Sequence, residues 1–231
     1  MLIGVDGCPG GWYVVQTDGG DEITARVYPR FVDLLADVDE DAIIAVDIPI
    51  GLHSIGSREC DMAARRALAP RRSASVFPAP LRPMLGRTTH AEASAVRRAI
   101  ENKGMSIQSF AITKKVHEVD LALASLPERE SSVYEVHPEV SFTHMNGGSP
   151  MSFAKKKVAG RAERGKLLAG TFGTAPDRLI AQRDRASVGA DDVLDALVGL
   201  WTAMRIRRGT AGALPVNPEA DQHGRRMTIF Y

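Results

Sequence analysis

The sequence predicts an α/β fold with a mixed sheet flanked by helices, and two observations carry this prediction. Short runs rich in aliphatic and β-branched residues, typical of strands, alternate with segments of helical periodicity. A strand, a hairpin, a helix and a second strand follow one another within residues 1–52, which combines an antiparallel hairpin with a parallel strand pair in one sheet. At 231 residues the chain fits one large domain or two small ones, and it can bury a proper core.

The first strand is predicted at residues 2–7, LIGVDG, and it leads Asp6 into a glycine-rich turn. Asp, Gly and Pro are ordinary residues of tight turns. This stretch alone therefore leaves two interpretations open, a plain turn or a carboxylate that faces a cation. Residues 12–29 predict a hairpin, because two β-rich runs flank the turn at residues 18–21, Asp-Gly-Gly-Asp. Residues 31–38 have apolar side chains at helical spacing.

The second strand is predicted at residues 42–52, AIIAVDIPIGL, which contain Asp47. The run is apolar on both faces, as expected of a central strand that is covered on each side. A strand–helix–strand connection favours parallel pairing, so Asp6 and Asp47 are expected at the same sheet edge, where open α/β sheets bind ligands. Two aspartates at corresponding strand ends predict a site, whereas one predicts only a turn.

Residues 55–130 differ from their surroundings, with helical periodicity, many charges and few strand signals. They predict a helical insertion within a single domain that spans residues 1–231. Further elements are expected as helices at 58–68, 90–103, 113–125, 153–170 and 188–209, and as strands at 131–142 and at the final MTIFY.

The helix at residues 188–209 carries Asp192 and Asp195, which are three residues apart and therefore neighbours on one helix face. The same helix has a strongly apolar side, and a carboxylate close to such a side is costly to desolvate unless a cation offsets it. The alternative is that Asp191 and Asp192 cap the helix while Asp195 is solvated.

Five carboxylates from these segments form the candidate catalytic set: Asp6, Asp47, Glu135, Asp192 and Asp195. All-oxygen clusters suit Mg²⁺ or Mn²⁺ rather than Zn²⁺. Two such ions are the usual arrangement for hydrolysis of a phosphodiester, because one activates water and the other stabilises the leaving oxygen.

Four further residues are candidates for substrate binding: Arg58, Arg65, His137 and Lys155. The cationic side chains suit the phosphates of a nucleic acid or a nucleotide. Two roles are open for His137: a general acid or base, or a residue that fixes the turn before Pro138.

The composition is that of an ordinary globular protein, with 44% hydrophobic and 25% charged residues. A net charge of +1 argues against nucleic-acid binding through gross positive charge, although a local basic groove remains compatible with it. The two cysteines, Cys8 and Cys60, make neither a disulfide framework nor a zinc cage, so a reduced, cytoplasmic protein is predicted. No apolar run approaches the length of a membrane span, and membrane association is not expected.

The order of these elements resembles the ribonuclease H-like fold, and residues 192–197, DVLDAL, are similar to the final-helix motif of Holliday-junction resolvases. More closely, six segments resemble the DUF429 family, a group described as predicted ribonuclease H-like nucleases. These segments are GVDGCPGGW, DIPIGL, RECDMAAR, AITKKVHEVD, YEVHPEVSF and GADDVLDAL.

The resemblance implies that Asp6 is the central metal ligand, that Asp47 takes the place of the second strand acid, and that Asp192 and Asp195 are the late-helix acids. Glu135 matches the glutamate of the family's EVHPE segment. The second acid of the superfamily is often a glutamate, and the shorter Asp47 leaves the number of metal ions open.

The function implied is a Mg²⁺- or Mn²⁺-dependent nuclease that acts on a nucleic acid or a nucleotide phosphodiester. Two alternatives stay open. One is a non-catalytic nucleic-acid or nucleotide binding protein on the same fold. The other is a phosphotransferase of the actin and sugar-kinase type, which also opens with an aspartate strand and a glycine-rich phosphate turn.

Overall fold

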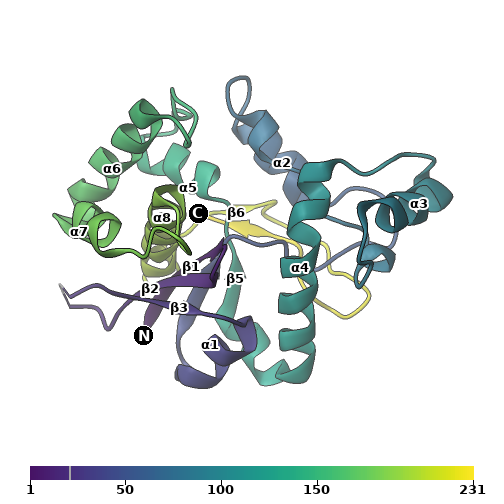
Figure 1. Ribbon diagram of the computed structural model, residues 1–231, viewed down its shortest axis with the longest axis horizontal. Helices are drawn as coiled ribbons and strands as arrows, with labels where there is room; N and C mark the ends of the chain where they lie inside the picture. The colour runs from purple at the N-terminus through teal and green to yellow at the C-terminus, as the bar shows by residue number, and fades with distance from the viewer. Residues whose placement is uncertain (21) are drawn as a thin grey trace.

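The computed structural model describes residues 1–20 and 22–231, so Asp21, in the predicted turn of the hairpin, lies outside the described residues. Five strands form one sheet in the order β3-β2-β1-β4-β5 (Figure 1). They are β1 (Leu2–Cys8), β2 (Gly11–Thr17), β3 (Thr24–Tyr28), β4 (Ile43–Val46) and β5 (Val133–Glu135). β1, β2 and β3 pair antiparallel, and β4 pairs parallel with both β1 and β5. The predicted α/β fold with a mixed sheet is confirmed.

Helices cover both faces of this sheet, with a separate apolar core on each. On one face, α1 (Phe31–Asp37) and α4 (Ile107–Ser125) pack against side chains such as Val5 and Val46. On the other face, α8 (Ala190–Arg207) packs against Ala45 and Cys8 and is surrounded by α5 (Pro138–Met145), α6 (Val158–Phe172) and α7 (Ala175–Gln182). Figure 1 shows these four helices gathered on one side of the molecule.

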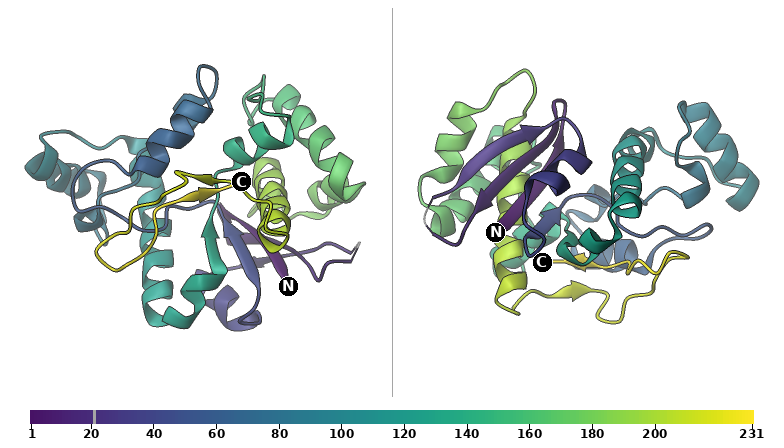
Figure 2. Two further views of the ribbon diagram at one scale, coloured as in Figure 1. Left: turned by 180° about the vertical axis from the view of Figure 1, so that it is seen from behind. Right: turned by 90° about the horizontal axis from the view of Figure 1, so that it is seen from below.

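The remaining elements lie around the end of the sheet. They are α2 (Glu59–Ala67), α3 (His90–Glu101), three short 3₁₀ turns, and the two-stranded sheet of β6 (Ala213–Leu214) and β7 (Ile229–Phe230). Seen from below, α3 lies farthest from the sheet, beyond α4 (Figure 2). Because α4 itself supplies core residues to the sheet, a helical insertion over residues 55–130 stays a prediction, as does the single domain.

Helix α8 lies unusually close to the middle of the sheet, and two glycines make this approach necessary. A methyl group on Gly4 in β1 would lie 2.0 Å from the backbone oxygen of Ala196, and one on Gly199 would lie 3.2 Å from the backbone oxygen of Ala45. Backbone therefore packs on backbone at this crossing, as small residues permit. The N-terminal half of α8 is thereby held over the ends of β1 and β4.

Several boundaries differ from the sequence prediction, among them the start of α4 at Ile107 and of α6 at Val158, and α7 was not predicted. The second strand is shorter than expected, since β4 ends at Val46 and Asp47 follows it directly. The strand predicted at residues 131–142 is wrong beyond Glu135, because α5 begins at Pro138. Proline is favoured in the first turn of a helix, where its missing N–H costs nothing. Within the described residues, no helix is long and apolar enough to cross a membrane.

Candidate functional site

Asp6 and Asp47 lie side by side because their strands pair in parallel register. Val5 is opposite Val46, and the backbone N–H of Asp47 donates to the carbonyl of Val5 at 3.0 Å. Side chains alternate along a strand, so Asp6 shares the face of Gly4, which is the face under α8. Burial, with the added charges of Asp195 and Asp47, raises the pKa of Asp6 well above its ordinary value.

The same physical causes act on Asp47, which is half-buried. Burial raises its pKa to about 7, Lys155 opposes this shift, and Asp195 adds to it. Two adjoining carboxylates with raised pKa values bind a proton or a cation more readily than ordinary aspartates do.

Helix α8 brings two more acids to this face. The Oδ2 atom of Asp192 accepts a hydrogen bond of 2.8 Å from the backbone N–H of Gly189, so Asp192 caps the helix, as one interpretation expected. Asp195 is 1% exposed and therefore not solvated. Its Oδ2 atom is paired with the Lys155 ammonium, and its buried Oδ1 atom has no hydrogen-bond partner among the described residues. A buried carboxylate oxygen without a partner is uncommon in folded proteins, and a bound ion or water is one explanation for it.

Lys155 reaches this site from the loop between α5 and α6. The charge of Asp195 raises the pKa of its ammonium, burial opposes the shift, and Asp6 and Asp47 add to it. The ammonium is the cation of the site in this structure. It therefore neutralises part of the charge that the aspartates bring together.

A further carboxylate near the site, Glu139 in α5, was missed by the sequence interpretation. It is 6% exposed, its Oε1 atom is paired with Arg164, and its Oε2 atom is buried without a partner in the described chain. Its negative charge helps to raise the pKa of Asp47. The signal that could have revealed it is Pro138, which starts a helix and turns Glu139 toward α8.

His137, which precedes α5, also faces this site. Burial lowers its pKa, with opposing effects from the charges of Glu139 and Asp195. Its Nδ1 atom is buried and has no hydrogen-bond partner in the described part of the chain. Burial therefore disfavours the charged imidazolium of His137, and one ring nitrogen is uncommitted among the described residues.

Glu135 does not join the aspartates. It is in register with Val46 and two residues after Val133, so its side chain lies on the opposite face of the sheet. There it binds Arg58, with Nη1–Oε2 and Nη2–Oε1 distances of 2.8 and 2.7 Å, and Arg58 also binds Asp61 at 2.5 Å. Burial raises the pKa of Glu135 to about 7 against the opposing charge of Arg58.

Cys60, Asp61 and Glu135 each offer a ligand atom within 4.8 Å of the others, and this buried group could hold a metal ion. In this structure the Arg58 guanidinium binds both carboxylates, with all its N–H groups directed at acceptors in this pocket. Arg65, the other arginine predicted to bind substrate, donates to the backbone oxygen of Val76 at 2.9 Å.

The structure thus brings together six of the nine candidate residues and separates three. Together on the α8 face are Asp6, Asp47, Asp192, Asp195, His137 and Lys155, whereas Glu135, Arg58 and Arg65 lie elsewhere.

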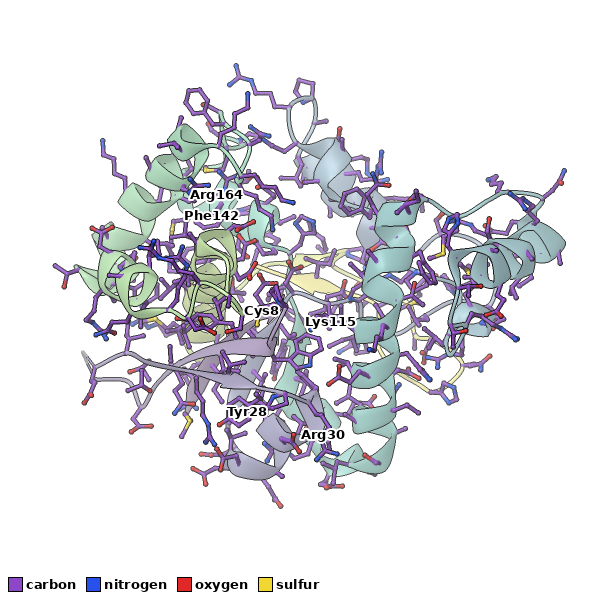
Figure 3. All side chains as sticks on the ribbon, in the orientation of Figure 1. Cys8, Tyr28, Arg30, Lys115, Phe142 and Arg164 are labelled. Atoms are coloured by element: carbon purple, nitrogen blue, oxygen red, sulfur yellow. The ribbon has the colours of Figure 1, made fainter. Side chains whose placement is uncertain are left out.

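A second lysine, Lys115 of α4, approaches the same end of β1 (Figure 3). Its ammonium lies 4.3 Å from the centre of the Trp12 ring and donates to the backbone oxygen of Gly11 at 2.6 Å. Burial lowers its pKa, while negative charges that include those of Asp6 and Asp192 oppose the shift. The sequence interpretation missed Lys115 as a site residue, although it lies in the AITKKVHEVD segment.

The glycines after Asp6 serve close packing. A Cβ atom on Gly10 would lie 2.8 Å from Ser187, and one on Gly11 would lie 2.2 Å from the backbone oxygen of Tyr28. The backbone N–H of Gly10 is already bonded to the carbonyl of Ser187. The turn is therefore filled by the protein itself and does not form an open cradle for phosphate.

Comparisons with known proteins extend these findings. No curated protein and no solved structure matches the chain significantly. A family model described as "Protein of unknown function (DUF429)" matches residues 4–220, which include all nine candidate residues. The resemblance predicted from the sequence motifs is confirmed, and the chain belongs to the DUF429 family.

Proposed function

We propose that this protein is a metal-dependent phosphodiesterase, a nuclease of the ribonuclease H-like type that acts on a nucleic acid or nucleotide. One observation carries the proposal. Asp6, Asp47, Asp192 and Asp195 come from three separate elements and meet on one face of the sheet, and among the residues that the structure describes the buried Oδ1 atom of Asp195 has no partner. Carboxylates brought together at a partly buried site are costly unless cations offset them, and Lys155 offsets only part of this charge.

These four aspartates would hold Mg²⁺ or Mn²⁺, and their all-oxygen donor set fits such ions. When bound, the ion would supply an activated water and neutralise charge on the phosphate. His137, whose pKa burial lowers and whose Nδ1 atom has no partner among the described residues, would accept or relay a proton. Lys155 and Lys115 would contact the substrate phosphate, whereas Arg58 has its N–H groups committed to Glu135 and Asp61.

A second candidate function is non-catalytic binding of a nucleic acid or nucleotide. The observation that favours it is the ion pair between Lys155 and Asp195, which stabilises the acids without a metal ion. The phosphotransferase alternative has no such support, because the glycine turn after Asp6 is filled by Ser187 and Tyr28.

The experiment compares the wild type with Asp6→Asn for Mn²⁺ binding by calorimetry and for cleavage of single-stranded, duplex and branched DNA and RNA. We expect metal-stimulated cleavage in the wild type and a loss of at least about 100-fold in the variant, the effect typical of removing a group that acts on transition-state charge. Asp33→Asn, which changes a carboxylate on α1 that pairs with Arg30, is the matched control and should leave cleavage unchanged. A wild type that binds nucleic acid but neither metal ion would establish the binding function instead.

A further inference from the structure

Two aromatic side chains differ from the other phenylalanine, tyrosine and tryptophan residues because they are exposed. Phe77 and Phe153 are 43% and 49% exposed, and every other side chain of these three types in the described part of the chain is buried or partly buried. Phenylalanine is among the residues most often buried in folded proteins. Exposed rings of this kind therefore point to a surface that another molecule covers.

The two rings lie on two loops that contact each other. Phe77 ends the α2 loop, residues 68–77, which follows α2, and Phe153 lies in the α6 loop, residues 146–157, which precedes α6. Figure 1 shows both loops at the same end of the molecule, at the top of the view. The Nε atom of Arg72 in the α2 loop donates to the backbone oxygen of Met151 in the α6 loop at 2.8 Å. The loops therefore form one continuous surface.

This surface borders the aspartate site. Lys155 of the α6 loop is paired with Asp195. Val76 of the α2 loop packs in one apolar cluster with Val140 of α5, the helix that begins directly after His137. A chain bound across the two loops would consequently pass beside the aspartates.

The backbone around Phe153 is fixed although its ring is exposed. Its N–H group donates to Glu163 at 3.1 Å, and the N–H group of Ser152 donates to the same carboxylate at 2.8 Å. The backbone oxygen of Phe153 accepts a hydrogen bond of 3.1 Å from Arg164, which is fully buried. The ring is thus held in place by its backbone while its faces are open to solvent.

Phe77 is presented in the same way. The residue before it, Val76, is buried, and its backbone oxygen accepts a hydrogen bond of 2.9 Å from Arg65. Two residues after Phe77, the backbone N–H of Ala79 donates to the buried carboxylate of Asp61 at 3.1 Å. Both rings therefore stand on preorganised backbone, which lowers the entropy lost when a ligand binds.

The two loops are also basic. The α2 loop contains Arg71 and Arg72, the α6 loop contains Lys155, Lys156 and Lys157, and neither loop contains Asp or Glu. The net charge of the whole chain is only +1, so positive charge is concentrated here. Arg71, Lys156 and Lys157 are exposed and form no ion pair among the described residues, unlike Lys155.

We propose that the surface formed by Phe77, Phe153, Arg71, Lys156 and Lys157 binds single-stranded nucleic acid, with bases stacked on the two rings and phosphates at the basic side chains. Aromatic rings beside a basic track are the usual means of binding single strands without sequence preference. This inference rests on the proposed phosphodiesterase function and names the class of its substrate.

A single strand fits this surface better than a duplex does. The bases of a duplex are stacked inside it, whereas the unstacked bases of a single strand can pack on aromatic side chains. A net charge of +1 is also far from the gross positive charge that favours duplex binding. An anionic membrane offers the same negative charge, but interfacial binding uses a continuous apolar helix face, and here the two rings stand on separate loops.

The test measures binding to the full-length protein by fluorescence anisotropy, in EDTA so that no metal-dependent cleavage occurs. The probes are labelled single-stranded DNA and RNA of about 12 nucleotides, within the range of site sizes of single-strand binding folds, and the corresponding duplexes. We expect a single strand to bind at least about tenfold more tightly than its duplex.

Substitution of the rings tests stacking. Phe77→Ala and Phe153→Ala should each weaken single-strand binding at least about fivefold, the loss typical of removing one stacking ring. Both side chains are exposed, so the variants should keep the thermal stability of the wild type. Phe153→Trp keeps a stacking face and should bind within about twofold of the wild type. Leu121→Ala is the matched control, since Leu121 is 55% exposed in the second half of α4, and it should bind as the wild type does.

The salt dependence of binding tests the phosphate contacts separately. Lys156→Gln combined with Lys157→Gln should reduce the slope of log K against log salt by about 1.4, because each phosphate contact on a single strand contributes about 0.7. The charge-matched control is Arg207→Gln combined with Arg208→Gln, which should leave the slope unchanged. These exposed arginines lie at the end of α8, where Arg207 donates to the backbone oxygen of Met1, at the opposite end of β1 from the aspartate site.

Two kinds of result would overturn the inference. One is duplex binding as tight as single-strand binding, or single-strand binding that is undiminished in both alanine variants. The other is binding of the wild type to vesicles that contain anionic lipid but not to the oligonucleotides. Single-strand binding without metal-dependent cleavage would overturn only the proposed phosphodiesterase activity, whereas cleavage of duplexes without single-strand binding would overturn only this inference.

Discussion

Two clusters of carboxylates lie against opposite faces of the same sheet, and they differ in how their negative charge is neutralised. On the α8 face, Asp6, Asp47 and Asp195 share one lysine, and an oxygen of Asp195 has no partner in the described part of the chain. On the α1 and α4 face, Glu135 and Asp61 share Arg58, whose planar guanidinium binds both carboxylates through separate N–H groups.

The comparison of the two clusters shows that a raised pKa does not by itself identify a functional site. Burial raises the pKa of Asp47 and of Glu135 to the same value, about 7. Glu135, however, accepts hydrogen bonds on both oxygens from Arg58 and a further one of 2.7 Å from the backbone N–H of Ile50. Its cluster is complete without a ligand, whereas the aspartate cluster is not.

The largest expected effect comes from breaking the complete cluster. Arg58→Met leaves Glu135 and Asp61 buried without their cation, and it should lower the free energy of unfolding by about 3–5 kcal/mol. Urea denaturation measures this change. Arg66→Met is the control, since Arg66 lies in α2, which begins directly after Arg58, and makes an exposed ion pair with Glu59, so that its loss should have a much smaller effect. Equal effects of the two substitutions would refute the structural role of Arg58.

The second prediction concerns the pH dependence of the metal-free protein. Because the pKa of Asp47 rises from 3.8 to about 7 on folding, the folded state binds its proton more tightly, and stability falls as the pH rises through this range. Asp47→Asn removes this contribution. Between about pH 5 and pH 8 the variant should lose about 2 kcal/mol less stability than the wild type. Urea denaturation at both pH values tests this, and an identical loss in the two proteins would contradict it.

Much of the aspartate site could be predicted from the sequence, because it depends on local patterns. Two apolar strands joined through a helix pair in parallel, and this places Asp6 beside Asp47. The Asp192–Asp195 spacing puts both acids on one helix face, and the apolar face of that helix must pack on the sheet.

The rest depends on features that have no local signal. Glu135 was grouped with the aspartates because it lies in a β-rich run and matches the glutamate of the EVHPE segment. Its neighbours Val133, Tyr134 and Val136 are all apolar or aromatic, so the sequence does not reveal which face Glu135 occupies. The pairing of Lys155 with Asp195, separated by 40 residues, depends on how a loop packs against buried Arg164. Such long-range contacts follow from the packed core rather than from residue spacing.

The smallest expected effect concerns the close crossing of α8 over β4, which holds this helix above the aspartate cluster. In Gly199→Ala the new methyl group would lie 3.2 Å from the backbone oxygen of Ala45, which cannot move as a side chain can. The helix must therefore shift away from β4, at a cost of about 1 kcal/mol in stability after the gain in helix propensity. Gly165→Ala in α6 is the matched control, because no atom of the described residues lies within 4 Å of the added methyl group beyond the helix itself.

Gly165→Ala should accordingly stabilise the protein by up to about 1 kcal/mol. Since Gly199 is one turn beyond Asp195, its substitution should also weaken Mn²⁺ binding severalfold, while the hydrogen bonds of Arg58 on the other face stay intact. Thermal denaturation and calorimetric titration of the two variants measure both effects. Unchanged Mn²⁺ affinity in a destabilised Gly199→Ala would mean that the aspartate site tolerates movement of α8, and that the close backbone crossing serves the fold rather than the site.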